Sequence, residues 1–356
     1  MPNWSEVREL YPSLKRWTFF NSATFGQISR RSLEAMEAHF RRREETAASD
    51  FLSWFEDADR LRGKLATLIH SSPDDIAFLP NTSTALGILL NGIDWRPGDE
   101  IVTLEDEFPN QIYAPLHQGP ALKEVPAAGL LDAITPNTRA VVVSSVNYTT
   151  GFRAPLEAWA PELRRRGVLL YVDATQMLGA LRFDFEAIQP DILAVNCYKW
   201  MLAPNGIAFM AVHPGLRGRL RPLSVGWRSH YDWRNVNNLW HGKPELKTTA
   251  EKYEGGMLPS SLMYALEASV DLMLELTPEA IEQRVLQLAS QTRALFPGAL
   301  PFEDTAIVAA KVDDAPALSA RLRQQGILTA ARHGMLRVST HFYNDESDIA
   351  RLAEAL

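Results

Sequence analysis

The chain of 356 residues contains a single cysteine, Cys197, and lacks any apolar run long enough to cross a membrane. One thiol can form neither an intrachain disulfide nor a cysteine-based zinc site, so we expect no metal. A membrane-spanning helix needs about 18 or more apolar residues in a row. The first residues carry charges throughout and no apolar signal-peptide core. We therefore expect a cytoplasmic protein without a membrane partner.

The glycine-rich phosphate loops of nucleotide-binding proteins are also missing. Neither GxxxxGK[ST] nor GxGxxG occurs, which argues against a nucleoside triphosphate or a dinucleotide as ligand. The formal net charge is -7, so the chain has no general attraction for phosphate backbones, and we expect no nucleic-acid partner. Hydrophobic residues make up 46% of the chain, which predicts a folded globular protein rather than a disordered one.

Short apolar runs alternate with amphipathic segments through the first two thirds of the chain. Five of these runs are rich in Val, Ile and Leu and predict buried strands, at 100–108, 139–148, 167–176, 190–200 and 206–214. Helix-like segments such as 155–167 lie between them. Strands buried on both faces, with helical crossovers, predict an α/β fold with a large, mostly parallel sheet.

The pattern changes after Gly242. A loop-like stretch at 243–261 leads into a long helix, and short strands then alternate with helices up to a final helix that Asn344 or Asp345 could cap. This predicts a smaller C-terminal α+β domain. We expect three parts: an N-terminal segment, 1–20, that packs with the small domain; a large domain, 21–245; and the small domain, 246–356.

Two predicted strands end in polar residues that could carry chemistry. Asp173 follows one apolar strand and Lys199 follows the next. Ligands of open α/β sheets bind at the carboxyl ends of the strands. An Asp there is often only a turn former, and a lysine is usually a surface residue. The alternative is a carboxylate that pairs with a protonated ring nitrogen and a nucleophilic amine with a lowered pKa, both of which pyridoxal 5′-phosphate (PLP) requires.

A third polar cluster lies at the start of the segment 81–93, just before its helix-like apolar run. Thr82, Ser83 and Thr84 could simply cap that helix. They could also form an anion site, in which hydroxyls and backbone N–H groups point at a phosphate. Asn196 and Tyr198 flank Lys199 and can also donate to a phosphate.

The ordered set of motifs resembles the class V aminotransferases of the fold-type I PLP enzymes. That group includes cysteine desulfurases, kynureninases and isopenicillin N epimerase-like proteins. The resemblance covers nearly the whole chain, and DATQ followed by YKW about one βα unit later is its most specific part. It runs through FFNSATFGQIS, NTSTALGILL, EDEFPNQIY, SSVNYTTG, YVDATQ, NCYKW, KYEGGMLPSS and LRVSTHFYN.

The resemblance implies a fold-type I architecture, PLP as cofactor, a homodimer and a role for each matching residue. Lys199 would carry PLP as a Schiff base, and Asp173 would pair with the pyridine nitrogen. Gln176 would contact the ring hydroxyl, Phe108 would stack on the ring, and Asn147 would lie near the substrate. Arg337 would grip the α-carboxylate of the substrate. The phosphate would be surrounded by Thr82, Ser83, Thr84, Asn196 and Tyr198.

Some segments depart from the family pattern. A glycine-threonine pair whose threonine reaches the phosphate of the neighbouring subunit is replaced here by Gly256 and Met257. The segment 327–339 lacks the catalytic cysteine loop of desulfurases, so we expect no desulfurase activity. The segment 226–234 is polar and aromatic, and two interpretations stay open for it: substrate contacts, or a surface or dimer loop. Its residues of interest are Trp227, Arg228 and His230.

The expected activity follows from this resemblance. The substrate would be a small molecule, an α-amino acid, and an aminotransferase is the first candidate. A PLP-dependent lyase or epimerase is the alternative, because the branch after proton removal is not fixed by the sequence. Two other classes stay open: an enzyme with another phosphorylated cofactor, and a non-catalytic binding protein that keeps the PLP fold.

Overall fold

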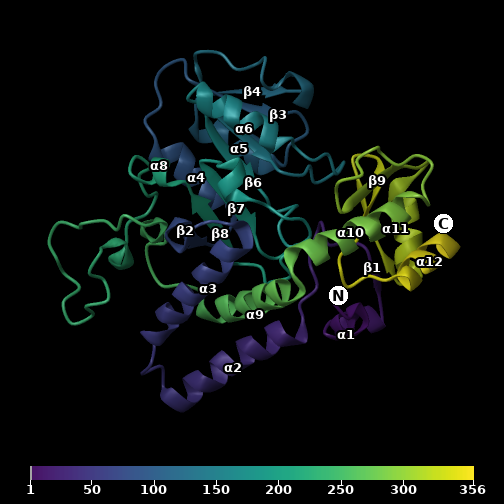
Figure 1. Ribbon diagram of the computed structural model, residues 1–356, viewed down its shortest axis with the longest axis horizontal. Helices are drawn as coiled ribbons and strands as arrows, with labels where there is room; N and C mark the ends of the chain where they lie inside the picture. The colour runs from purple at the N-terminus through teal and green to yellow at the C-terminus, as the bar shows by residue number, and fades with distance from the viewer. Residues whose placement is uncertain (1) are drawn as a thin grey trace.

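The computed structural model describes residues 2–356 and contains two α/β units of unequal size (Figure 1). The helices are α1 (Trp4–Glu9), α2 (Arg30–Thr46), α3 (Ser53–Ile69), α4 (Thr82–Gly92), α5 (Pro109–Gln118), α6 (Leu156–Arg165), α7 (Phe185–Ile188), α8 (Pro214–Arg217), α9 (Ser260–Leu276), α10 (Pro278–Arg293), α11 (Ala315–Gln324) and α12 (Glu346–Ala355). The strands are β1 (Thr18–Phe19), β2 (Ile76–Leu79), β3 (Glu100–Leu104), β4 (Ala121–Val125), β5 (Thr138–Ser144), β6 (Leu169–Asp173), β7 (Ile192–Asn196), β8 (Ala208–Val212), β9 (Ile307–Lys311), β10 (Ile327–Leu328), β11 (Ala330–Arg332) and β12 (Met335–Ser339).

The larger unit is built on a seven-stranded sheet with the order β2-β8-β7-β6-β5-β3-β4. β3 to β7 pair in parallel, while β8 runs antiparallel to both of its neighbours. β5 to β8 are buried along almost their whole length, as expected for strands with helices on both faces. The predicted α/β class and the mostly parallel sheet are confirmed.

Helix-terminal residues explain where several connecting helices begin and end. The Asn81 side chain accepts a hydrogen bond from Thr84 N and starts α4. Asp345 caps α12 by accepting from the backbone of Ser347 and Asp348, so of the two predicted capping residues Asp345 takes this role. Gly167, which follows α6, has a φ of 69°, a left-handed conformation that favours glycine.

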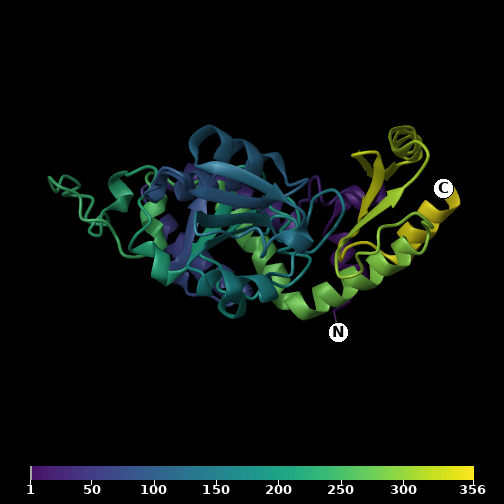
Figure 2. The ribbon, with the colours of Figure 1, turned by 90° about the horizontal axis from the view of Figure 1, so that it is seen from above.

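The smaller unit contains an antiparallel sheet in the order β11-β12-β9, covered by α10, α11 and α12. β1 pairs in parallel with β10, and Arg8 forms an ion pair with Asp348 at 2.7 Å. The N-terminal segment therefore lies against the C-terminal part of the chain, and both termini lie in this region (Figure 2).

The long helix α9 lies with the larger unit. It packs against α2 and α3, and the Ser269 hydroxyl donates to the Met201 carbonyl. The sequence predicts a boundary at residue 246, with α9 in the small domain, and that boundary stays a prediction; in the structure α9 itself contacts α2 and α3. The apolar residues of α9 are buried, and its contacts with α2 and α3 join segments distant in the chain, which local patterning does not reveal. α10 then crosses from one unit to the other (Figures 1 and 2).

No helix within residues 2–356 combines the length and the apolar character that a membrane crossing requires. Nor do these residues contain a group of three or more His, Cys, Asp or Glu side chains arranged to hold a metal ion.

Candidate active site

A cavity of about 320 Å³ opens at the carboxyl edge of the large sheet. It lies where β5, β6 and β7 end, next to the N-termini of α4 and α5, which is the usual position of ligand sites in open α/β sheets. The lining residues are Asn81, Ser83, Phe108, Asn110, Ser144, Tyr148, Asp173, Thr175, Gln176, Asn196, Tyr198 and Lys199.

Lys199 supplies the amine of this cavity. Its side chain is 7% exposed, and no described residue forms an ion pair or a hydrogen bond with Nζ. Burial is the main cause that lowers the pKa of Lys199 to about 8, although the negative charge of Asp173 opposes the shift. Nζ lies 5.4 Å from the centre of the Phe108 ring and 5.7 Å from that of Tyr198. An amine with this pKa is neutral in a substantial fraction of molecules near pH 7–8 and can act as a nucleophile or a base.

The backbone around Lys199 is held by the loop that precedes α2. Gly26 N donates to the Tyr198 carbonyl at 2.9 Å. A Cβ atom on Gly26 would lie 1.9 Å from the Lys199 carbonyl oxygen, so a side chain at this position would push the two segments apart. The glycine therefore allows the close approach that positions Lys199.

Asp173 ends β6 and is 6% exposed. One carboxylate oxygen accepts from Thr175 N at 2.9 Å, which is the turn-forming role expected of an Asp after a strand. Among the described residues, no donor contacts the other oxygen. Asp173 therefore combines both alternatives considered for it: one oxygen holds the turn, and the other is available to a ligand in the cavity.

The predicted phosphate cluster lies at the N-terminus of α4. Ser83 lines the cavity, whereas Thr82 and Thr84 are not among its lining residues. Thr82 Oγ1 accepts from the Asn196 amide at 2.8 Å, which holds Asn196 toward the helix. The Ser83 N–H has no acceptor in the described part of the chain. A helix N-terminus with an unused N–H and a nearby hydroxyl and amide is suited to an anion.

Gln176 and Asn147 are more constrained than their predicted roles require. The Gln176 amide donates to the Ala23 carbonyl at 3.0 Å and accepts from the Trp200 indole at 2.8 Å, which leaves one N–H for a ligand. Asn147 does not line the cavity. Its oxygen accepts from Thr149 N and Thr150 N, and its nitrogen donates to a backbone carbonyl. Its contact with the substrate stays a prediction.

Arg337 lies on β12 and is only 1% exposed. Its guanidinium donates to the Tyr148 carbonyl and the Thr24 hydroxyl, both at 2.5 Å, while Nε has no partner among the described residues. No carboxylate pairs with it there. Burial is the main cause that lowers the pKa of Arg337 to about 9, and Arg332 adds to the shift. The expected alternation is observed, with Leu336 and Val338 on the opposite, apolar face.

Glu107 is a site residue that the sequence analysis missed. Its carboxylate accepts from Ser144 N and from the Ser144 hydroxyl, both at 2.6 Å, and from Phe108 N at 3.1 Å. Burial raises the pKa of Glu107 to about 7. It therefore positions Phe108 and Ser144 at the cavity wall. Ser144 could have been found from the sequence, because it ends a buried strand as Asp173 does.

The segment 226–234 does not reach the cavity within one chain. Arg228 is 1% exposed and pairs with Glu251 and Glu254 at 2.7 and 2.9 Å. His230 stacks on His241 with ring centres 4.0 Å apart. These contacts favour a structural role for Arg228, and the sequence had left this question open.

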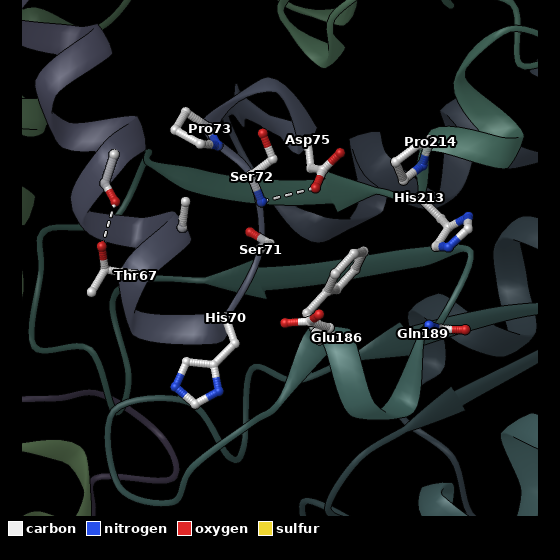
Figure 3. Close-up of a pocket in the computed structure, with 13 residues that line it drawn as sticks. Thr67, His70, Ser71, Ser72, Pro73, Asp75, Glu186, Gln189, His213 and Pro214 are labelled. Carbon is white, nitrogen blue, oxygen red and sulfur yellow. Dashed lines mark hydrogen bonds between the residues drawn. The ribbon is translucent and has the colours of Figure 1, made fainter.

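A wider hollow of about 680 Å³ lies at the opposite edge of the same sheet (Figure 3). It is bordered by His70, Asp75, Glu186 and His213, next to the start of β2 and the end of β8. Asp75 Oδ2 accepts from Ser72 N at 3.0 Å, a hydrogen bond that caps the short 3-10 helix Pro73–Asp75. This hollow is more open than the cavity at Lys199, and it lies away from the carboxyl ends of the parallel strands. It is therefore not the candidate active site.

Comparison with known proteins agrees with this geometry. The family model Aminotransferase class-V matches residues 19–298. Isopenicillin N epimerase of Amycolatopsis lactamdurans is 28% identical, over 99% of this chain and 98% of the relative. A probable cysteine desulfurase of Methanothermobacter thermautotrophicus is 25% identical, over 99% and 96%. The structure of the cystine C-S lyase C-DES, with cysteine persulfide, superimposes with a TM-score of 0.88 at 25% identity, covering 97% of this chain and 98% of C-DES.

A second structure of C-DES, a variant, contains glycine covalently linked to PLP. The family match and these structural neighbours indicate pyridoxal 5′-phosphate as the cofactor. The cavity fits this group: Lys199 is a buried amine without an acidic partner, Asp173 has an available carboxylate oxygen, and α4 presents an unused N–H. The chain therefore belongs to the class-V aminotransferase family of PLP enzymes, with a fold-type I architecture.

Proposed function

We propose that the chain acts on an α-amino acid and that Lys199 is the base that removes the proton from the α-carbon. The observation that supports this most directly is the buried Lys199 amine, whose pKa is lowered to about 8 at the edge of a cavity of substrate size. We propose transamination as the first candidate reaction, in keeping with the family match.

Each residue has a task in this proposal. When bound, PLP supplies an electron sink for the negative charge that develops at the α-carbon. Asp173 holds a proton at the ring nitrogen through its available oxygen. Ser83 and the N-terminus of α4 hold the phosphate, with Thr82, Thr84, Asn196 and Tyr198 around them. Phe108, which lines the cavity, would stack on the ring and exclude water, and Arg337 would orient the α-carboxylate.

Gln176 and Asn147 keep their places in the proposal with weaker support. Gln176 offers its one remaining N–H to the ring hydroxyl. Asn147 would have to give up part of its turn to reach a substrate. A cytoplasmic location also belongs to this proposal, because a lone cysteine suits a reducing compartment.

A lyase or epimerase is the second candidate. Support comes from the names of two similar proteins, isopenicillin N epimerase and the cystine C-S lyase C-DES. All three reactions begin with the same proton removal by Lys199. They differ in whether the proton returns to the α-carbon and in whether a side-chain group leaves.

An amino-acid panel with product identification tests the proposal. The PLP-loaded enzyme is incubated in deuterium oxide with single α-amino acids, each with and without a 2-oxo acid that can accept the amino group in transamination. We expect deuterium at the α-carbon or loss of the α-proton, and a 2-oxo acid as the product of transamination. Inverted configuration would identify an epimerase, and ammonia with side-chain loss would identify a lyase. Lys199→Ala is the control and should do none of these. No exchange with any amino acid would contradict the proposal.

A further inference from the structure

One aromatic side chain of the cavity wall, Tyr148, has no task in the proposed function. Most of the other lining residues would hold PLP or supply the lysine amine. Tyr148 is the largest of the lining side chains that remain and the only aromatic one among them; the others are Asn81, Asn110, Ser144 and Thr175. Its ring is therefore the largest part of the wall left to meet a substrate.

Tyr148 lies beside two residues that would border the substrate. Its carbonyl accepts from Arg337 at 2.5 Å. Its ring meets the Phe108 ring edge to face, with ring centres 5.3 Å apart and an interplanar angle of 86°. In the proposed function Arg337 holds the α-carboxylate and Phe108 stacks on PLP. A substrate that spans these two groups places the first atoms of its side chain near the Tyr148 ring.

The Tyr148 side chain is held at both ends. Its hydroxyl lies 2.9 Å from Nε2 of His333, at the tip of the β11–β12 hairpin. Its backbone belongs to a tight turn, in which Asn147 Oδ1 accepts from Thr149 N and Thr150 N, both at 2.9 Å. The ring can swing aside only if the contact with His333 breaks. It therefore forms a fixed wall that joins the large unit to the hairpin of the small unit.

The space beside this wall is small. The cavity of about 320 Å³ lies at the lower end of the roughly 300–1,000 Å³ of pockets for drug-sized ligands, and it has to hold PLP as well as the substrate. A bulky side chain would need the volume of the Tyr148 ring, and tightly packed walls resist added volume. We propose, on the basis of the proposed function, that Tyr148 limits the size of the substrate side chain, so that the enzyme prefers small α-amino acids to bulky ones.

The test measures kcat/KM for alanine, leucine and phenylalanine in the parent and in two variants. A misfit of a single methylene already changes selectivity by roughly ten-fold or more, so we expect the parent to prefer alanine to phenylalanine by at least that factor. Tyr148→Ala opens the wall and should raise the ratio of phenylalanine to alanine roughly ten-fold, with leucine in between. Tyr148→Phe keeps the ring and should stay close to the parental ratio.

A ratio of two substrates in one preparation does not depend on how much of the enzyme is folded. If Tyr148→Ala does not fold at all, Tyr148→Leu replaces it and should raise the ratio by a smaller factor. Tyr113→Ala is the control, because it removes an exposed ring of α5 that does not line the cavity, and it should leave the ratio unchanged. A parent that converts phenylalanine as well as alanine, or a Tyr148→Ala variant with the parental ratio, would overturn the size limit while the turnover itself upholds the proposed function.

A binding measurement tests the wall without turnover. Propionate and 3-phenylpropionate have the carbon chains of alanine and phenylalanine but no amine, so they cannot react. Calorimetry on the PLP-loaded proteins should show that Tyr148→Ala binds 3-phenylpropionate roughly ten-fold more tightly than the parent does, with similar binding of propionate by both. If no amino acid is turned over but this difference appears, the proposed function fails and the size limit stands. Equal binding of 3-phenylpropionate by the two proteins rejects the wall.

Discussion

At the scale of single residues, Lys199 gives the clearest pH signature. Only the neutral amine can attack the PLP aldehyde, and burial lowers its pKa from 10.5 to about 8. The neutral fraction rises with pH through that value, from roughly one tenth at pH 7 to most molecules above pH 9. We therefore expect PLP incorporation into the apoprotein, followed by absorbance, to accelerate with pH and level off near pH 9. A midpoint near 10.5 would contradict the burial argument, and Lys199→Ala should show no borohydride-fixed cofactor.

Substitutions of Asp173 can separate its role in the turn from its proposed role toward the cofactor. Asp173→Asn keeps an oxygen for the Thr175 N–H but loses the charge that holds the ring proton, whereas Asp173→Ala loses both. We expect the Asn variant to melt at the temperature of the parent with PLP binding weakened by about 2–3 kcal/mol and little turnover. The Ala variant should also be less stable. Parental turnover in the Asn variant would show that the carboxylate does not serve the cofactor.

We predict that Arg337 binds the α-carboxylate of the substrate. Its buried guanidinium has no carboxylate partner among the described residues, so we expect a substrate carboxylate to supply the counter-charge. Arg337→Ala should lower kcat/KM for α-amino acids roughly ten- to thousand-fold, about 1.5–4 kcal/mol, and leave PLP binding nearly unchanged. Amino-acid amides provide the comparison. If the variant loses as much activity on the amide as on the acid, Arg337 does not hold the carboxylate.

At the scale of elements, the β11–β12 hairpin is the basis of our prediction about sulfur chemistry. The hairpin is closed by His333 and Gly334 and contains no cysteine. Cys197 is fully buried beneath the sheet edge, and burial raises the pKa of its thiol well above the usual value. We propose that the chain does not form a persulfide from cysteine, although cysteine desulfurases are among its relatives.

Mass spectrometry after incubation with cysteine tests this. The parent and Cys197→Ala should behave alike, with no added sulfur on the protein. Stoichiometric persulfide on Cys197 together with alanine release would refute the prediction.

Five of the seven strands of the large sheet could be predicted because each is a short apolar run, and residues 169–173 and 192–196 stood out with Asp173 and Lys199 at or just beyond their ends. β2 and β4 were not predicted, and β4 carries polar residues and is largely unburied. The packing position of α9 could not be predicted from the sequence. Its sequence is apolar on much of its surface, and only the packing against α2 and α3 shows which unit it joins.

At the scale of the whole molecule, we expect a homodimer. Large apolar side chains are exposed on the segment that projects from the larger unit after α8, including Tyr231 at 64% and Trp240 at 83%, and on Met257 at 55% (Figure 1). Exposed apolar groups of this size are usually covered in an assembly. The segment around Gly256 would then reach the site of the partner subunit.

Light scattering at working enzyme concentration should give twice the mass of one chain. Trp240→Asp should weaken association and lower PLP retention together, while Tyr113→Asp, at another exposed aromatic residue, serves as the comparison. A fully active monomer would rule out a shared site.

The sequence by itself determined the strand pattern, the α/β class and the position of the chemical residues along the chain. These depend on local features: apolar periodicity, polar residues at strand ends and turn-forming residues. The ordered motifs also pointed to the family and to PLP before any contact was known.

Only the tertiary structure decided which of these side chains are free to act. Asn147 is occupied by its own turn, Glu107 is buried behind Phe108, and Arg228 is bound by Glu251 and Glu254. Arg332 shares one face of the small sheet with Arg337 because β11 and β12 pair in antiparallel register. Hydrogen-bond partners, burial and pKa shifts arise from residues distant in the chain, and one sequence contains no direct record of those distances.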